Sequence, residues 1–253
     1  RTAQWIADEL ERIGFEHVEL AELPGSNPLV LADWLHAEGA PTILVYGHYD
    51  VQPVDPIELW ETAPFEPFVK DGRVVGRGAA DDKGQLHMHL KAAEAILATR
   101  GRLPLNLKFI FEGEEEHSSI GLDAWLEANK ARLAADAVVI SDTGFFEGNI
   151  PAITIGLRGM MYAQIDVTGT EVDLHSGAYG GVVENPANAL ARIIAGLKDA
   201  DGRILVPGFY DDVVELAEDE RRRIAELPFD EDAYLAHLGL PALHGAAGYS
   251  TLE

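Results

Sequence analysis

Two kinds of apolar pattern alternate along the first part of the chain. Apolar residues recur at helical spacing from Trp5 to Ile13, and Gly14 follows them as a plausible helix end. Helical spacing returns over residues 86–97 and 122–133. The runs that indicate strands cover residues 18–20, 29–35, 42–46, 105–111 and 137–140. Because predicted strands alternate with predicted helices, we expect an α/β fold with a mixed, mostly parallel sheet flanked by helices.

The pattern changes near residues 156–159, Gly-Leu-Arg-Gly. Partial alternation over residues 160–168 predicts a strand, residues 186–197 have helical spacing, and the chain beyond Asp211 is helical and acidic. We therefore expect two domains, covering residues 1–159 and 160–253.

Composition narrows the classes of function that need to be considered. The chain has 253 residues, of which 47% are hydrophobic, and a formal net charge of −24, which argues against nucleic acid and anionic membranes as partners. There is no cysteine, so thiolate zinc sites, disulfides and cysteine nucleophiles are excluded, and a reducing, cytoplasmic location is expected. No apolar run approaches the roughly 20 residues that a membrane span needs.

Polar side chains follow the predicted strands at the point where each strand ends. In an open α/β sheet, ligands bind beyond the carboxyl ends of the strands. The glycine-rich turn 76–84, between a short apolar run and a helix, contributes two adjacent carboxylates, Asp81 and Asp82. The candidate groups at these strand ends and in this turn are His48, Asp50, Asp81, Glu115, Glu116 and Asp142.

Imidazole and carboxylate ligands without thiolates suit zinc, manganese or cobalt. Six such groups exceed the three or four ligands of a single metal, so they indicate a two-metal site with a shared carboxylate. Residues two apart in a strand point the same way, so Asp50 is placed to orient His48. Glu115 and Glu116 are adjacent and diverge, so that one could bind metal while the other acts as a base.

Each of these groups also has an ordinary structural explanation. A lone histidine at a strand end is commonly a hydrogen-bonded or surface residue, residues 114–116 could be a solvated charge run, and Asp82 or Asp142 could cap a helix or turn. The coincidence of four placements favours the site. His87, His89 and His117 are treated as ordinary residues.

Five segments carry a resemblance to a known family. The chain resembles the co-catalytic dinuclear zinc exopeptidases and deacylases, which include aminoacylase, carboxypeptidase G, succinyl-diaminopimelate desuccinylase and the carnosinase-like dipeptidases. The loop 173–181 looks most like the cytosolic nonspecific dipeptidase branch. The matching segments are residues 47–53, 76–84, 112–116, 141–142 and 173–181.

The resemblance implies a role for each residue. His48 and Asp142 would hold one metal, Asp81 would bridge, and Glu116 would hold the second. Asp50 would steady His48, and Glu115 would act as general base and later as acid. His175 would reach across a dimer and stabilise the oxyanion. The family's peptide bond between Asp81 and Asp82 is usually cis.

The resemblance also implies an activity and partners. Residues 1–159 would be part of a catalytic metallopeptidase domain, and residues 160–253 part of an inserted α+β lid through which a homodimer forms. The expected cofactors are two divalent ions, zinc or alternatively manganese or cobalt, and the expected substrate is a dipeptide or small peptide. An N-acyl-amino-acid deacylase or carboxypeptidase, or a non-catalytic metal-binding or dimerisation module, remains an alternative.

One departure from the family concerns its second metal. The family has a histidine ligand near the C-terminus, after the lid, whereas the later histidines here, His237 and His244, lie in lid sequence. We therefore expect the chain to be a fragment of a longer protein, with both domains truncated and the enzyme incomplete.

Overall fold

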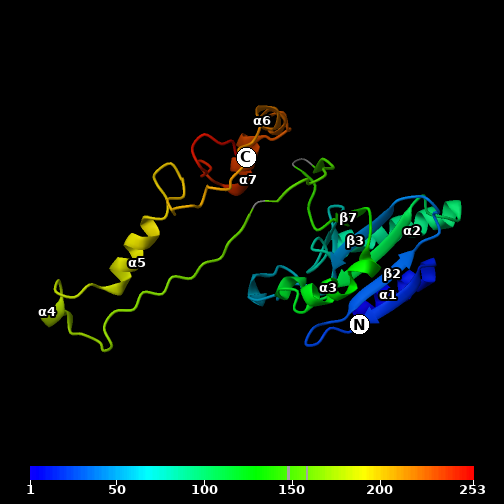
Figure 1. Cartoon of the computed structure of the whole chain (residues 1–253), viewed down its shortest axis with the longest axis horizontal. Helices are drawn as coiled ribbons and strands as arrows, with labels where there is room; N and C mark the ends of the chain where they lie inside the picture. The colour runs from blue at the N-terminus through cyan, green and yellow to red at the C-terminus, as the bar shows by residue number, and fades with distance from the viewer. Residues whose placement is uncertain (147–148, 158) are drawn as a thin grey trace. The chain divides into compact units, whose positions relative to one another are not determined.

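The structure is a computed structural model that describes residues 1–146, 149–157 and 159–253 (Figure 1). The chain forms two compact units, Arg1–Gly144 and Phe145–Glu253, which are described separately below. The predicted domain boundary between residues 159 and 160 remains a prediction, and Arg158, in the segment that suggested it, lies outside the described residues.

The first unit is a five-stranded sheet with helices on both faces (Figure 1). The strand order is β1-β2-β6-β3-β7; β2 is antiparallel to both of its neighbours, and the other strands share one direction. This confirms the predicted mixed, mostly parallel sheet flanked by helices. In chain order the elements are α1 (Thr2–Ile13), β1 (Glu16–Ala21), β2 (Leu29–Trp34), β3 (Thr42–His48), the 3₁₀ helix η1 (Ile57–Leu59), β4 (Phe68–Lys70), β5 (Arg73–Val75), α2 (Lys83–Arg100), β6 (Asn106–Glu112), the 3₁₀ helix η2 (Glu115–His117), α3 (Leu122–Leu133) and β7 (Ala137–Ile140).

Alternating side chains of the central strands form the two halves of the core. In β6, Phe109 and Phe111 face the cluster that contains Leu10 of α1 and Leu90 of α2, whereas Ile110 faces the cluster with Leu122 of α3. Successive side chains of a strand point to opposite faces, so a continuous apolar run fills both layers. The helices thus pack against both faces of the sheet.

The end of α1 lies where the sequence placed it. Gly14 has a left-handed backbone with φ 96°, and its amide donates to the carbonyls of Leu10 and Glu11. A residue without a Cβ adopts this conformation at little cost, which is why glycine stops helices here.

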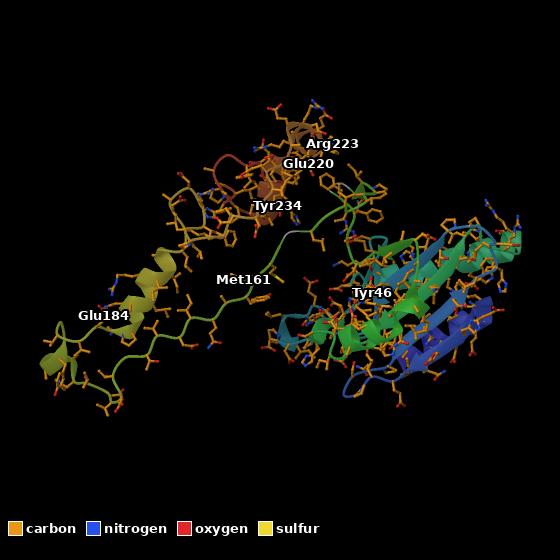
Figure 2. The ribbon with its side chains drawn as sticks, in the orientation of Figure 1. Tyr46, Met161, Glu184, Glu220, Arg223 and Tyr234 are labelled. Atoms are coloured by element: carbon orange, nitrogen blue, oxygen red, sulfur yellow. The ribbon has the colours of Figure 1, made fainter. Side chains whose placement is uncertain are left out.

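The second unit contains helices but, in the part of it that the structure describes, no strand. The predicted strand over residues 160–168 is therefore wrong. The segment is without regular structure, and Met161 projects from it with its side chain exposed (Figure 2). A strand needs a partner for its backbone N–H and C=O groups, and no described segment pairs with this one. The helices are α4 (Ser176–Tyr179), α5 (Pro186–Ala195), α6 (Glu218–Ala225) and α7 (Glu231–Leu238).

Among the described residues, no helix combines the length and apolar character that crossing a membrane requires.

Candidate metal centre

The candidate centre lies at the edge of the sheet where the parallel strands β3, β6 and β7 end. The register pairs His48, the last residue of β3, with Glu112, the last residue of β6. Asp142 follows the end of β7 by two residues, and η2 follows β6 after a short turn. Parallel pairing therefore brings together groups that are up to 94 positions apart in the sequence.

His48 is the centre of this arrangement, because its side chain is fully buried and both ring nitrogens face carboxylates. Its Nε2 lies 3.0 Å from Asp81 Oδ1 and 3.5 Å from Asp142 Oδ2. One donor atom from each of these three residues lies within 4.8 Å of the others. On the other side of the ring, Nδ1 lies 3.1 Å from Asp50 Oδ1.

Asp50 connects His48 to the turn that carries the adjacent glutamates. Its Oδ2 accepts a hydrogen bond from the Glu116 amide at 3.0 Å. Gln52 Nε2 donates to Glu116 Oε2 at 2.6 Å. Glu114 accepts from the side-chain amide of Asn27 at 2.6 Å. Glu114 and Glu116 thus each have a hydrogen-bond partner from another segment of the chain.

The two aspartates of the glycine-rich turn occupy different environments. The peptide bond between Asp81 and Asp82 is cis. Asp81 is largely exposed on the open side of the centre, whereas Asp82 is buried and its Oδ2 accepts from the His48 amide at 3.1 Å. Asp82 precedes α2 without a capping hydrogen bond from its side chain, so capping does not explain its carboxylate.

Close packing surrounds the Asp82 carboxylate. A Cβ at Gly47 would lie 2.7 Å from Asp82 Oδ2, so any larger residue there would displace this carboxylate. Asp82 Oδ1 finds no hydrogen-bond partner among the described residues, and burial raises the pKa of Asp82 to about 6.

The charges of the centre perturb one another. Burial lowers the pKa of His48, but the hydrogen bonds that its ring nitrogens make to the carboxylates of Asp81 and Asp50 outweigh it, and the net pKa is raised. Burial, together with the charges of Asp142, Glu116 and Asp50, raises the pKa of Glu115. Burial and the charge of Asp81 likewise raise the pKa of Asp142. This crowding of anions around one imidazole is the environment that a cation would relieve.

Two supporting contacts were missed by sequence reasoning. The buried carboxylate of Glu112 accepts from Tyr46 Oη at 2.5 Å and from Ser119 Oγ at 3.0 Å, which ties the end of β6 to β3 and to the segment after η2. His89 Nε2 lies 2.7 Å from Ser141 Oγ, beside Asp142. The helical spacing that places His89 near the buried face, three residues after Leu86, was the available signal.

His175 lies in the second unit, where it precedes α4. Its Nδ1 accepts a hydrogen bond from the Gly177 amide at 3.1 Å. His237 lies in α7 and His244 beyond it.

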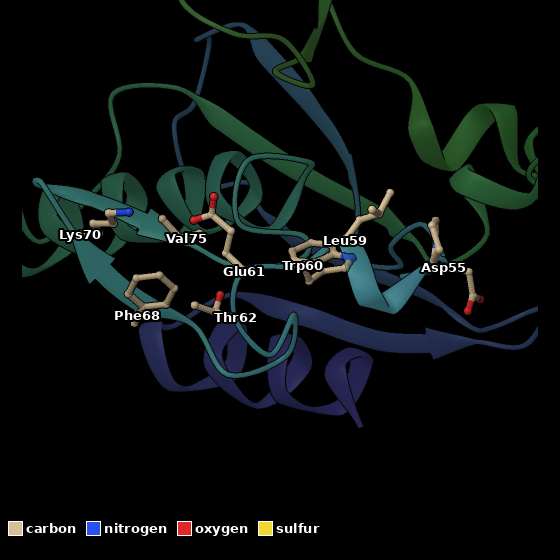
Figure 3. A pocket seen from close by; sticks show the side chains of 9 residues that line it. Asp55, Leu59, Trp60, Glu61, Thr62, Phe68, Lys70 and Val75 are labelled. Atoms are coloured by element: carbon tan, nitrogen blue, oxygen red, sulfur yellow. The ribbon is translucent and has the colours of Figure 1, made fainter.

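A separate hollow of about 490 Å³ lies in the loop region between β3 and α2 (Figure 3). Its wall includes the aromatic rings of Trp60 and Phe68. The Arg77 guanidinium lies 4.9 Å from the centre of the Trp60 ring and donates to the Pro53 carbonyl at 3.1 Å. The lining contains none of the carboxylate or imidazole groups described above, so this hollow is distinct from the candidate centre.

Comparison with known proteins defines the class. Residues 44–234 match the profile of peptidase family M20/M25/M40, which covers the strand ends that carry the candidate centre. The chain therefore belongs to this peptidase family, and the family resemblance stated from the sequence is confirmed.

Two curated relatives are named as dipeptidases. The chain is 37% identical over 239 residues to a Beta-Ala-His dipeptidase of Homo sapiens, covering 90% of this chain and 47% of the relative. It is 36% identical over 252 residues to the Cys-Gly metallodipeptidase DUG1 of Candida albicans, covering 94% of this chain and 52% of the relative. The chain thus spans about half the length of these relatives.

Solved structures agree with the fold. An M20 family metallo-carboxypeptidase, Sso-CP2 from Sulfolobus solfataricus, superposes with a TM-score of 0.80 at 35% identity, covering 99% of this chain and 56% of that one. Human carnosine dipeptidase 1 gives a TM-score of 0.68 at 30% identity, covering 95% of this chain and 52% of that one.

Proposed function

We propose that the protein to which this chain belongs is a metal-dependent hydrolase of dipeptides or small peptides. The observation that carries the proposal is the convergence of His48, Asp81 and Asp142 within 4.8 Å at the strand ends. The names of the relatives, a Beta-Ala-His dipeptidase and a Cys-Gly metallodipeptidase, favour dipeptides as substrates.

The residues of the candidate centre fit divalent metal ions. One imidazole and several carboxylates form the donor set that zinc, manganese and cobalt accept, and Asp50 orients the imidazole from behind as an outer partner. We infer that His48 and Asp142 would hold one ion, Glu116 would hold a second, and Asp81 would be a ligand shared by both. The ions, when bound, would lower the pKa of a water molecule and polarise the carbonyl of the substrate.

Glu115 is the proposed general base. It takes a proton from the attacking water and then donates it to the leaving amine. Burial raises the pKa of Glu115 above its ordinary value, the direction that suits a group that must both accept and release a proton. Asp50 contacts both the His48 ring and the Glu116 amide, and so holds the proposed ligands and the neighbouring base in fixed positions relative to one another.

Removal of metal tests the proposal directly. We expect the full-length protein to lose dipeptide hydrolysis after treatment with a chelator and to regain it with zinc or manganese, because the water is otherwise unactivated. The same preparation should be assayed with N-acyl amino acids. Undiminished hydrolysis by metal-free protein would overturn the proposal, and a preference for N-acyl substrates would indicate a deacylase instead. A preparation that binds metal but hydrolyses neither substrate would indicate a non-catalytic module.

His175 is proposed to stabilise the oxyanion from the partner subunit of a homodimer. Loss of one oxyanion donor typically lowers kcat by a factor of about 10²–10³, so we expect His175→Ala to lose activity in that range while folding and metal content persist.

Subunit mixing distinguishes action between subunits from action within one. Inactive His175→Ala and inactive Glu115→Gln protein are combined under conditions that allow subunits to exchange. If sites are shared, a mixed dimer has one site with both defects and one with neither, so activity should return. Absence of recovery after verified exchange would contradict a shared site.

The number and identity of the ions, the homodimer and the cytoplasmic location all remain predictions.

A further inference from the structure

A second cluster of metal-ligating side chains lies on the edge strand β1 and its neighbour β2. Single donor atoms of Glu16, His17 and Asp33 all lie within 4.8 Å of one another. His17 Nδ1 lies 2.8 Å from Asp33 Oδ1, and His36 Nε2 lies 3.1 Å from Glu16 Oε2. We propose that this cluster, defined as Glu16, His17, Asp33 and His36, is a second binding site for a zinc-like divalent ion.

A break in the strand pairing creates the cluster. Adjacent residues of a regular strand point to opposite faces, which would separate Glu16 from His17. The register of β1 against β2 shifts between Glu16 and Glu19, and His17 has a left-handed backbone with φ 49°. Such a bulge changes the direction in which a side chain points. Here it allows the His17 ring to contact Asp33, which is also the cross-strand partner of Glu16.

Two carboxylates of the cluster face each other across the strand pair. Glu16 and Asp33 are direct partners across the antiparallel pair, where like charges destabilise the sheet. Two neighbouring basic side chains are engaged elsewhere: Arg132 pairs with Glu19 at 2.7 Å, and Lys108 donates to the carbonyls of Arg132 and Ala134. His17 and His36 are therefore the basic groups, among the described residues around the cluster, that contact the two carboxylates.

The donor set selects the class of ion. One imidazole nitrogen with two carboxylates suits zinc, nickel or copper better than magnesium or calcium, which prefer oxygen alone. In this site His17, Asp33 and Glu16 bind the ion, which replaces the hydrogen bond between His17 and Asp33. His36 contacts the Glu16 carboxylate and would hold this ligand in place. Asp50 has the corresponding role for His48 at the candidate centre, with carboxylate and imidazole exchanged.

The cluster is separate from the candidate centre. Asp33 pairs with Lys108 in β6, and Lys108 pairs with Leu44 in β3, four residues before His48. The cluster therefore lies toward the opposite end of the parallel strands, and its strands β1 and β2 are three and two positions from β3 in the sheet order. Its existence does not depend on the proposed function.

The test uses the full-length protein with Asp81→Ala, which weakens the candidate centre, and zinc alone as the probe. Bound zinc is measured by equilibrium dialysis and elemental analysis, with and without a second substitution. His17→Asn tolerates the left-handed backbone, and Asp33→Asn keeps the shape of the side chain. We expect either substitution to remove about one zinc per chain. We expect His36→Gln to weaken zinc binding by roughly 10–100-fold, the usual effect of mutating a residue that holds a metal ligand in place.

His237→Asn, on α7 and outside both clusters, is the matched control and should retain the zinc. Histidine NMR of the unsubstituted chain provides a measurement that does not depend on the folding of variants: zinc, but not magnesium, should shift the His17 ring signals. Equal zinc content in the His17→Asn, Asp33→Asn and control proteins, or unshifted His17 signals at saturating zinc, would overturn the proposal.

Discussion

Replacement of Glu115 by glutamine is expected to lower the kcat of the full-length protein by a factor of about 10²–10⁴, the usual contribution of a general base. Glutamine keeps the size of the side chain but cannot accept the proton of the attacking water. Because the proposed ligands are other residues, metal content should be unchanged. Steady-state kinetics with a dipeptide and elemental analysis of the same preparation measure both quantities.

Two companion variants make the Glu115 result specific. Glu114→Gln is the matched control, because that neighbouring carboxylate is occupied by Asn27 and should keep near-normal turnover. Asp81→Ala should lose metal as well as activity, because Asp81 is the proposed bridge. If Glu115→Gln lost metal while Asp81→Ala retained it, the roles of base and ligand would have to be exchanged.

The second large effect is expected in the core beneath the candidate centre. Phe111→Ala should lower the free energy of unfolding by about 3–5 kcal/mol, the range for removing a buried aromatic ring. Phe111 is fully buried, stacks on Phe109 with ring centres 5.2 Å apart, and pairs with Gly47 one residue before His48. Such a loss is a large share of the ~5–15 kcal/mol that typically stabilises a domain.

Urea denaturation followed by circular dichroism measures this loss. Phe65→Ala is the control, since that ring is 64% exposed in the same unit and should change stability little. A loss at Phe111 no larger than at Phe65 would mean that the ring does not hold β6 against its neighbours.

The sequence by itself determined most of the local elements of the first unit and which polar groups lie at its strand ends. The span of α1, its end at Gly14 and the runs that became β3, β6 and β7 follow from periodicity, because burying one face or two faces of an element leaves a pattern within a short window. The placement of His48 at the end of β3, and of Asp50 and Asp142 two residues beyond their strands, also follows from that pattern, because parallel strands end at one edge.

Only the tertiary structure decided how these groups contact one another. That Asp50 contacts both His48 and the Glu116 amide, that Asp82 is buried while Asp81 is exposed, and that His89 meets Ser141 depend on contacts up to 66 positions apart. Residues 160–168 also show that a sequence pattern does not reveal pairing, because the predicted strand has no partner among the described residues. Periodicity reports which face of a segment is apolar, but the partner that completes its hydrogen bonds is a property of the assembled chain.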